Sequence, residues 1–267
     1  MPAKGATAHR HIVITGASSG IGQALAREYA APGRVLGLLG RDKSRLDSVA
    51  AECSRLGAET RVGVLDVRDR NGLADWLKEF DSTYPVDLVV ANAGVLVRMP
   101  GGEVEPADEA YGLIQTNVLG VLNTVQPVVP LMVARRRGQV AIISSVAAFT
   151  PLPHSPSYSA SKAAVLNYGL SLRTLLAVRG VGVSVVCSGF VETPMIAEVY
   201  DPKPFNMGAE KAAKIIRDGL ERDRAVIMFP FFFGLMSRID GLLPDRLRRY
   251  FYARSARGRH LYQPDRQ

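Results

Sequence analysis

Hydrophobic and polar positions follow two patterns along this chain. Short apolar runs rich in Val, Ile and Leu are separated by longer segments whose apolar residues recur every three or four positions. The first pattern predicts buried strands, and the second predicts amphipathic helices. The predicted strands cover residues 11–15, 34–39, 60–67, 86–94, 139–145, 181–189 and 225–229.

Helical spacing fills the intervals between these strands. Asp42 is expected to cap one helix, and Pro127 and Pro130 are expected to bend or end the longest one. Apolar strands without polar alternation, separated by helices, indicate a parallel sheet covered on both faces. We therefore predict an α/β fold, a doubly wound parallel sheet of the Rossmann type in three layers. The predicted helices cover residues 21–30, 43–56, 69–80, 107–135, 157–178 and 208–221.

The domain organisation follows from where this alternation starts and stops. Residues 11–230 are expected to form one catalytic domain, which includes a proline-rich substrate lid at 193–207. Residues 1–10 lack the apolar core of a signal peptide and are expected to be a mobile lead. Residues 231–267 form an extension that is first apolar and then rich in arginine. No apolar run approaches about 18 uninterrupted residues, so no membrane-spanning helix is expected.

The distribution of charge is informative mainly in the C-terminal extension. The net charge is +8, and residues 246–259 hold six arginines and no acid. The apolar part can pack on the domain or a partner subunit, leaving the arginines solvated, or residues 230–259 can contact a membrane surface. Nucleic acid is the least favoured partner, because no nucleic-acid-binding motif accompanies the arginines. Two cysteines form no disulfide framework. We expect a cytoplasmic protein, at the inner face of a membrane if the extension binds lipid.

A glycine-rich loop follows the first predicted strand directly. The segment TGASSGIG (15–22) places three glycines before a helix. Glycine permits the tight turns that bring a backbone close to a ligand, and the helix N-terminus favours a phosphate. In a strand–loop–helix unit this pattern predicts a dinucleotide site.

The end of the second strand distinguishes the two dinucleotides. An acid at this place would bind the adenosine ribose of NAD, whereas an arginine suits the 2′-phosphate of NADP. Here Gly40 takes the position of the acid and Arg41 follows it. The sequence therefore favours NADP(H) over NAD(H), although a plain surface arginine is the alternative for Arg41. No metal is expected.

A tyrosine and a lysine stand one helical turn apart in SPSYSASK (155–162). Residues four apart lie on the same face of a helix, so the Lys162 ammonium can approach the Tyr158 phenol. A neighbouring positive charge lowers the pKa of a phenol from its usual value of about 10. The pair is therefore a candidate acid/base, although a core tyrosine beside a solvated lysine would have the same spacing.

These motifs together resemble the short-chain dehydrogenase/reductase family, over roughly residues 10–200. The glycine loop, ANAG (91–94), Asp66, Asn117, Ser145, Tyr158 and Lys162 occur in the order and at the spacings of that family. The resemblance implies that Tyr158 exchanges the proton and that Lys162 lowers its pKa and binds the nicotinamide ribose. It implies that Ser145, rather than Ser144, holds the carbonyl oxygen. Asn117 would position a water linked to Lys162, or simply satisfy a neighbouring carbonyl.

The resemblance also implies the rest of the site. CSGFVETPM (187–195) departs from the family, because Ser188 replaces a proline, which should loosen this turn. We expect a homodimer or homotetramer built on helices 107–135 and 157–178. The expected substrate pocket comprises Val146, Phe149, His154 and Met195. The implied cofactor residues are Gly16, Ser18, Ser19, Gly20, Ile21, Gly22, Arg41, Asp66, Val67, Asn92, Ala93, Gly94, Tyr158, Lys162, Gly189, Val191 and Thr193.

The expected activity is NAD(P)(H)-dependent interconversion of a small-molecule carbonyl and an alcohol by hydride transfer. The favoured direction is NADPH-dependent reduction of an apolar carbonyl, or of a cell-envelope precursor if the extension touches membrane. The alternative is a catalytically silent sensor or scaffold that binds dinucleotide. An intact Ser145, Tyr158 and Lys162 argue against that alternative, since a non-catalytic binder does not need a phenol beside a lysine.

Overall fold

The computed structural model describes residues 9–97, 104–197, 206–230, 244 and 246. Seven parallel strands form one sheet in the order β3-β2-β1-β4-β5-β6-β7. This is the doubly wound arrangement predicted from the sequence, and its direction reverses between β1 and β4. The strands are β1 (His11–Thr15), β2 (Val35–Gly40), β3 (Glu59–Val64), β4 (Leu88–Ala91), β5 (Gln139–Ser145), β6 (Gly182–Ser188) and β7 (Val226–Phe229).

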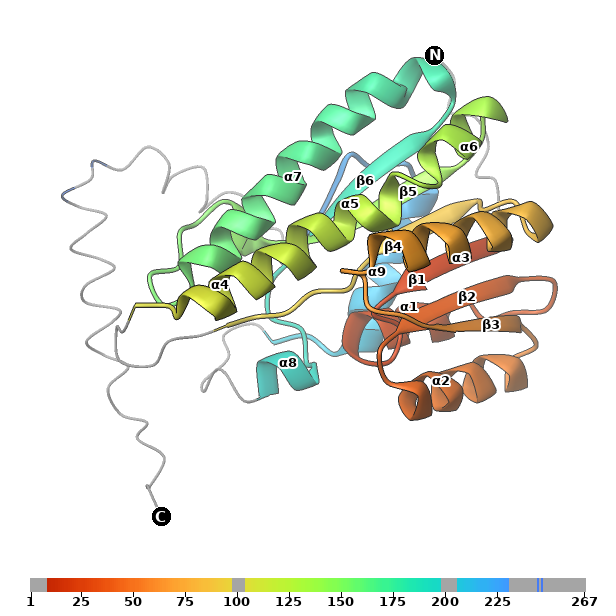
Figure 1. The fold of residues 1–267 in the computed structure, drawn as a ribbon, viewed down its shortest axis with the longest axis horizontal. Coiled ribbons are helices and arrows are strands. Elements are labelled where there is room, and N and C mark those ends of the chain that lie inside the picture. The colour runs from red at the N-terminus through yellow and green to blue at the C-terminus, as the bar shows by residue number, and fades with distance from the viewer. Residues whose placement is uncertain (1–8, 98–103, 198–205, 231–243, 245, 247–267) are drawn as a thin grey trace.

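Helices cover both faces of the sheet, which gives three layers (Figure 1). One layer contains α1 (Gly20–Tyr29), α2 (Lys43–Arg55) and α9 (Ala209–Glu221). The other contains α3 (Arg70–Thr83), α4 (Ala107–Ile114), α5 (Gly120–Val125), α6 (Val129–Ala134) and α7 (Pro156–Leu176). The short α8 (Pro194–Ala197) and the single turns η3 (Val146–Ala148) and η4 (Ala177–Arg179) complete the described helices, together with a π-helical turn, η2 (Gln115–Leu119).

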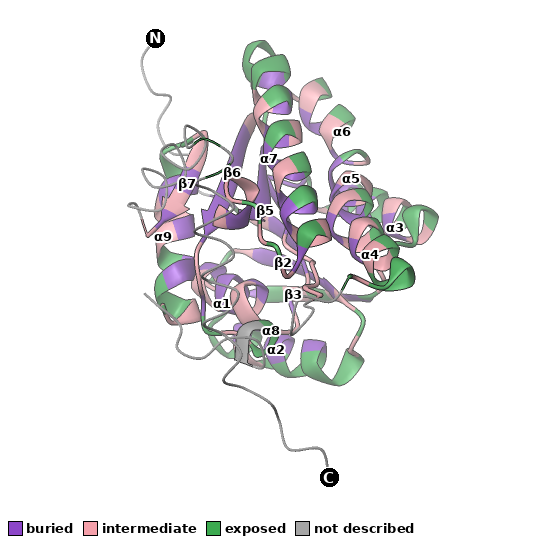
Figure 2. Ribbon diagram, turned by 90° about the vertical axis from the view of Figure 1, so that its left-hand side faces the viewer, coloured by how far each residue is buried: buried purple, intermediate pink, exposed green. Residues whose placement is uncertain are grey.

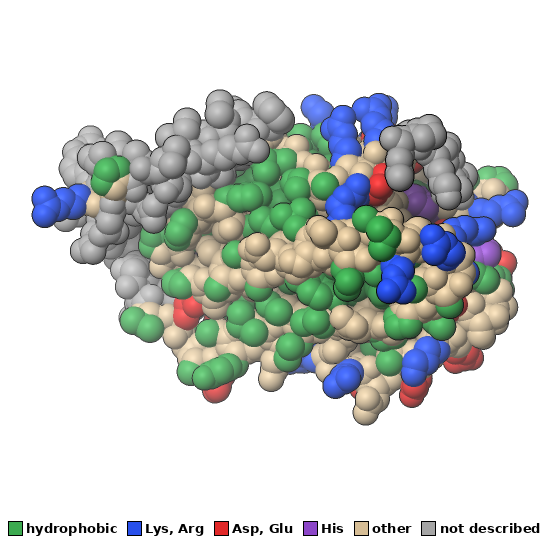
Figure 3. Space-filling view, turned by 90° about the horizontal axis from the view of Figure 1, so that it is seen from above, with side chains coloured by type: hydrophobic (Ala, Val, Ile, Leu, Met, Phe, Trp, Pro, Cys, Tyr) green, Lys and Arg blue, Asp and Glu red, His purple; other side chains and the backbone are tan. Residues whose placement is uncertain are grey.

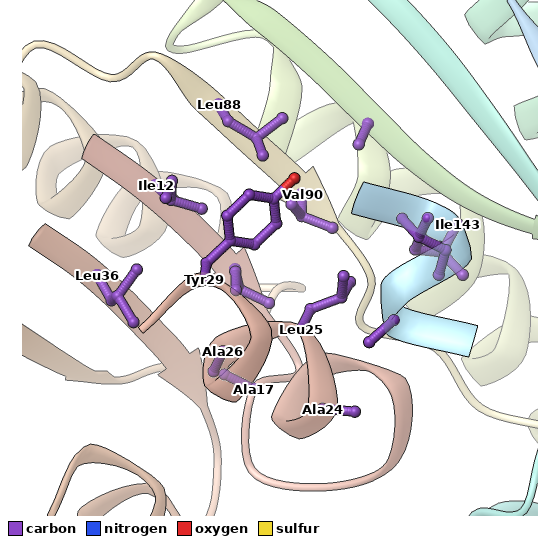
Figure 4. Packing of buried hydrophobic residues seen from close by; sticks show 14 of the residues in the cluster. Ile12, Ala17, Ala24, Leu25, Ala26, Tyr29, Leu36, Leu88, Val90 and Ile143 are labelled. Carbon is purple, nitrogen blue, oxygen red and sulfur yellow. The ribbon is translucent and has the colours of Figure 1, made fainter. Parts of the chain in front are cut away.

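The core lies on the two faces of the sheet. Figure 2 shows the central strands buried, whereas the edge strand β3 and the outer faces of the helices are largely exposed. In the α1 layer, the Tyr29 ring packs among Leu25, Leu88 and Val90 (Figure 4). Its hydroxyl is the buried polar side-chain atom without a partner among the described residues, and burial raises the pKa of this phenol.

The long helical region differs from its sequence prediction in two ways. It is divided at the π-helical turn η2 and again near Pro127, and only the second division was expected. By length and composition, Ala107–Ala134 is also apolar enough to cross a membrane, with a mean hydropathy of 1.4. This finding rests on length and composition alone, so the expectation that no helix spans a membrane stays a prediction. Val121, Val125 and Met132 are buried against the sheet, so core packing accounts for the inner face of this region.

Three predicted segments lie wholly or mostly outside the described residues. They are the N-terminal lead up to residue 8, residues 198–205 of the lid, and the C-terminal extension except for Pro244 and Arg246. The end of the lid is tied to the residues just before its start: Val191 bridges to Met207, and the Asn206 amide donates to the Glu192 carboxylate at 2.8 Å.

Candidate active site

A single cavity of about 840 Å³ runs along the carboxyl ends of the strands, where doubly wound sheets bind ligands. Its glycine-loop end is formed by Gly16 and residues 18–21, with Arg41 and Asp66 after β2 and β3. Its tyrosine end is formed by Ser145 at the end of β5, and by Tyr158 and Lys162 on α7. In the sheet order, β4 lies between β1, which leads into the glycine loop, and β5, which ends at Ser145.

The glycine loop is packed so closely that side chains do not fit. A Cβ added to Gly22 would lie 2.2 Å from the Gly16 carbonyl oxygen and 2.5 Å from Asn92 Nδ2. Gly16 has a φ of +65°, and its added Cβ would meet Ala93 Cα at 2.9 Å. These glycines are therefore required by close backbone approach as well as by conformation.

Asn92 holds the glycine loop against β4. Its side-chain amide donates to the Thr15 and Gly16 carbonyl oxygens at 2.9 and 3.1 Å. The Thr15 hydroxyl in turn accepts from the Asn92 backbone N–H at 3.1 Å. The ANAG segment thus fixes the loop from the neighbouring strand. Ser19, the N-cap of α1, makes no side-chain capping bond, so the first amides of this helix remain available to an anion.

Two arginines and two aspartates, Arg41, Arg45, Asp42 and Asp66, are the charged residues that line the glycine-loop end. The Arg41 side chain is 67% exposed, and its Nη1 lies 3.9 Å from Asp66 Oδ2. Asp66 is bound by the Arg68 guanidinium at 2.7–3.1 Å, and these hydrogen bonds lower the pKa of Asp66 below its usual value. Asp42 caps α2 as predicted, accepting from the Arg45 backbone N–H at 3.0 Å. Both acids are paired with arginines, and Arg41, itself within ion-pair distance of Asp66, lines the cavity.

Tyr158 and Lys162 lie together at the opposite end. The Lys162 ammonium is 5.5 Å from the centre of the Tyr158 ring and donates to the Ile143 carbonyl oxygen at 3.1 Å. Lys162 is buried, and desolvation lowers its pKa from 10.5 to about 8, an effect that nearby Cys187 partly opposes. A buried ammonium acts on its neighbours through a medium that screens charge less than water does.

The two serines at the end of β5 have different partners. The Ser144 hydroxyl donates to the Lys162 carbonyl oxygen at 2.8 Å, so it ties the strand to α7. The Ser145 hydroxyl donates to the Ser188 carbonyl oxygen at 3.3 Å and accepts from the Ala147 N–H at 3.1 Å. Ser145 is also the N-cap of η3. Ser188, which the sequence singled out as a departure from the family, therefore contacts the candidate catalytic serine through its backbone.

Asn117 is buried behind the cavity and does not line it. Its side chain accepts from the Val95 N–H at 2.8 Å and donates to the Val95 carbonyl at 2.9 Å and to the Ser161 hydroxyl at 3.2 Å. A Cβ added to Gly94 would lie 3.2 Å from Asn117 Oδ1 and 3.5 Å from Lys162 Nζ. Asn117 thus holds the loop after β4 beside Lys162.

Most of the other predicted residues line this one cavity. All of the predicted cofactor residues do so except Gly22, which lies behind the loop. Val146 and Met195 of the predicted pocket also line it, whereas Phe149 and His154 do not. Phe149 instead packs on the apolar cluster of Leu166, Val185 and Cys187, because η3 turns the chain back onto α7 and β6.

Several lining residues were not predicted. Leu96 follows the ANAG segment, Thr150 and Leu152 lie between β5 and α7, and Phe190 follows β6. All four stand in loops, where side-chain direction has no period. The only available signal was their position just after the carboxyl ends of strands.

Comparisons with known proteins agree with this geometry. The family model described as short chain dehydrogenase matches residues 10–204. An uncharacterized oxidoreductase from Myxococcus xanthus is 35% identical over 90% of this chain and 94% of its own length. A 3-oxoacyl-[acyl-carrier-protein] reductase from Thermotoga maritima is 34% identical over 68% of this chain and 74% of its own. A short-chain dehydrogenase from Sphingobium yanoikuyae, solved in complex with NADPH, matches with a TM-score of 0.75 and 27% identity over 97% of this chain and 98% of its own.

Proposed function

Because the chain belongs to the short-chain dehydrogenase family, we propose that it is an NADPH-dependent reductase of apolar carbonyl compounds, with Tyr158 as the proton donor. The proposal rests on one observation: a single cavity joins the glycine loop to Tyr158, which lies beside the buried Lys162. Reduction of a carbonyl needs a hydride and a proton delivered to opposite ends of one C=O bond. The glycine-loop end can bind the hydride donor, and the tyrosine end can supply the proton.

The glycine-loop end fits the diphosphate and adenosine parts of a dinucleotide. The glycines leave room for a close backbone approach, and the uncapped start of α1 offers amides to the phosphates. Bound NADPH would supply the hydride. Arg41 lines this end and is largely exposed, so it would bind a 2′-phosphate, while Asp42 and Asp66 are paired with arginines. This arrangement supports NADPH over NADH.

The tyrosine end supplies the acid and its support. The Tyr158 hydroxyl gives its proton to the substrate oxygen as that oxygen gains negative charge. The Lys162 ammonium favours the phenolate that remains, because opposite charges attract strongly where water is excluded. The Ser145 hydroxyl lies at the same end and can turn from Ser188 to donate to the substrate oxygen. Asn117 keeps Val95 and Gly94 in place beside Lys162.

The walls near Tyr158 support an apolar substrate. Among the described residues, Val95, Leu96, Val146, Leu152, Phe190 and Met195 line this part. The charged lining residues of the described chain are Lys162 here, and Arg41, Asp42, Arg45 and Asp66 at the glycine-loop end. A small anionic carbonyl compound would find no second cation in the described wall. A cell-envelope substrate and membrane contact depend on residues 230–259, so they stay predictions.

We also infer a homo-oligomer built through the α4–α5 and α7 side. Figure 3 shows hydrophobic side chains gathered on the face at the top of Figure 1, where these helices lie. Tyr111 on α4, Leu119 on η2 and Leu175 on α7 are large hydrophobic residues that are exposed, at 72%, 49% and 65%. Burial of such side chains stabilises subunit contacts. Light scattering of the purified protein tests this inference, and a monomeric mass would contradict it.

The experiment for the proposed function is a cofactor titration followed by turnover. NADPH and NADH are titrated into the wild type, Arg41→Ala and the control Arg55→Ala at the far end of α2. We expect tighter NADPH binding by the wild type, a loss of about tenfold or more in Arg41→Ala, and little change with NADH or in the control. Equal binding of both cofactors by the wild type would remove the NADP assignment.

Turnover is then measured with NADPH and two probes, the apolar diketone phenanthrenequinone and the anionic sulfoacetaldehyde. With oxygen excluded, we expect the diketone to be reduced to its hydroquinone in proportion to the NADPH consumed, and little product from the anion. Faster reduction of sulfoacetaldehyde would contradict the apolar pocket, and binding of neither cofactor would contradict the reductase itself.

A further inference from the structure

The helix that carries Tyr158 and Lys162 begins without a cap of its own. Ser155 is the N-cap of α7, but its hydroxyl makes no bond to the helix and donates instead to the Val97 carbonyl oxygen. The first turn of α7 contains no acidic residue. The first amides of a helix need acceptors and favour a negative charge. Another part of the chain has to supply both.

Glu105 supplies them from a distance of 52 residues in sequence. Its Oε2 accepts from the Ser157 backbone N–H at 3.0 Å, and its Oε1 accepts from the Ser157 hydroxyl at 2.9 Å. Pro156, the preceding residue, has no N–H to satisfy. The Glu105 carboxylate therefore caps α7 from the segment that leads into α4.

Tyr158 stands between two serines that are both anchored outside the helix. Ser157 is bound by Glu105, and the Ser159 hydroxyl accepts from the Leu152 N–H at 2.9 Å. Leu152 lines the cavity, so Ser159 is tied to the cavity wall. The backbone on either side of Tyr158 is thus held from two directions, and Glu105 provides the only charged group in these two contacts.

We propose that Glu105 is a positioning residue for proton transfer, which fixes the first turn of α7 and so the direction of the Tyr158 hydroxyl. Its effect on turnover rests on the proposed function, because it acts through Tyr158. Glu105 does not line the cavity, so it does not act by touching the substrate. A displacement of a reacting group by about 1 Å can cost about a hundredfold in rate, which gives a remote clamp a measurable effect.

The kinetic test compares Glu105→Ala and Glu105→Gln with the control Glu109→Ala. The control removes an exposed acid from the first turn of α4. Phenanthrenequinone reduction gives kcat, and fluorescence titration gives the NADPH Kd. We expect kcat to fall about tenfold or more in Glu105→Ala while the Kd changes less than about twofold. Glu105→Gln retains an oxygen that can accept from the Ser157 N–H, so it should recover most of the activity, and Glu109→Ala should match the wild type.

Two outcomes of this test would overturn the proposal. One is a wild-type kcat in Glu105→Ala, and the other is a Gln variant no better than the Ala variant. If Glu105→Ala does not fold, Ser157→Ala takes its place, because it removes only the hydroxyl bond. A smaller loss of kcat with unchanged Kd is then expected, and no loss would contradict the clamp.

Amide hydrogen exchange separates this proposal from the proposed function, because it needs no turnover. Peptides that cover residues 155–165 should exchange faster in Glu105→Ala than in Glu105→Gln or Glu109→Ala, with the change confined to the first turn of α7. Unchanged exchange would overturn the clamp even in an active enzyme. Faster exchange in a protein that reduces no carbonyl compound would leave the clamp in place and refute the reductase.

Discussion

The two ends of the cavity are built from different parts of the chain. The glycine-loop end is made mostly of backbone: Gly16 and Gly22 pack against a carbonyl oxygen and the Asn92 amide, and the start of α1 presents free amides. The tyrosine end is made of side chains, with a buried Lys162 and a Tyr158 held by its neighbours. Substitutions that add volume should therefore damage the glycine-loop end. Substitutions that remove or neutralise a side-chain group should damage the tyrosine end.

The largest expected effect is at Tyr158. Tyr158→Phe removes the proton donor and keeps the ring, so kcat should fall by about 10²–10⁴-fold, the usual range for loss of a general acid. NADPH affinity should change little, because the glycine-loop end is untouched. Stopped-flow reduction and cofactor titration measure both. Tyr168→Phe, on the same helix but bonded to Gln126, is the control. A sensor or scaffold would show no dependence of its function on the Tyr158 hydroxyl.

A stability effect is expected at Lys162. Its pKa is about 8 in the folded protein and 10.5 for the unperturbed group. Below pH 8 both states carry the charge, and the folded state bears the full cost of burying it. Between these two values the unfolded chain binds the proton more strongly, so wild-type stability rises with pH. Above them Lys162 is neutral in both states and the cost is gone.

Lys162→Met should therefore stabilise the cofactor-free protein at pH 7 by up to about 3 kcal/mol, at about 1.36 kcal/mol per pKa unit, while it abolishes turnover. The gain should shrink as the pH rises from 8 towards 10.5. Urea unfolding at several pH values measures it. A gain that is the same at every pH would mean that folding does not shift the pKa of Lys162 and that apolar packing alone explains the effect.

The smallest expected effect is at the glycine-loop end of the cavity. Gly22→Ala puts a methyl group 2.2 Å from a carbonyl oxygen, so it should cost about 1–3 kcal/mol of stability and weaken NADPH binding. Gly112→Ala, in α4 with no atom within 4 Å of the added Cβ, should instead stabilise the helix by about 1 kcal/mol. Thermal unfolding measures the change in stability of each variant. An equal change in Gly22→Ala and Gly112→Ala would mean that helix propensity outweighs the crowding at Gly22.

The elements of the fold were predictable because they depend on local periodicity. All seven strands and their parallel arrangement follow from short apolar runs between helices, and Asp42 follows from the capping preference. The placement of Tyr158 beside Lys162 follows from helical spacing. Strand ends were predicted less well, since 86–94 contains only the strand Leu88–Ala91 and then a loop.

What the sequence did not predict depends on contacts between distant segments. Phe149 was expected in the pocket, but the short turn η3 places it on the cluster with Leu166. The bonds from Glu105 to Ser157 join residues 52 apart, and no local pattern marks them. The same holds for the Tyr29 hydroxyl, which is buried without a partner among the described residues although the residue fits the apolar face of α1.

The π-helical turn at Gln115–Leu119 makes the length of the chain matter in this region. A π turn contains one residue more than an α turn, and one residue corresponds to about 100° of rotation along a helix. Deleting one residue within 115–119 would leave a regular α turn, so α4 and α5 would keep their relative orientation, but Asn117 would lose the position from which it bonds Val95. Added volume is harder to accommodate than a change of length here, because a Cβ on Gly120, directly after the turn, would lie 2.6 Å from Val67 Cγ2.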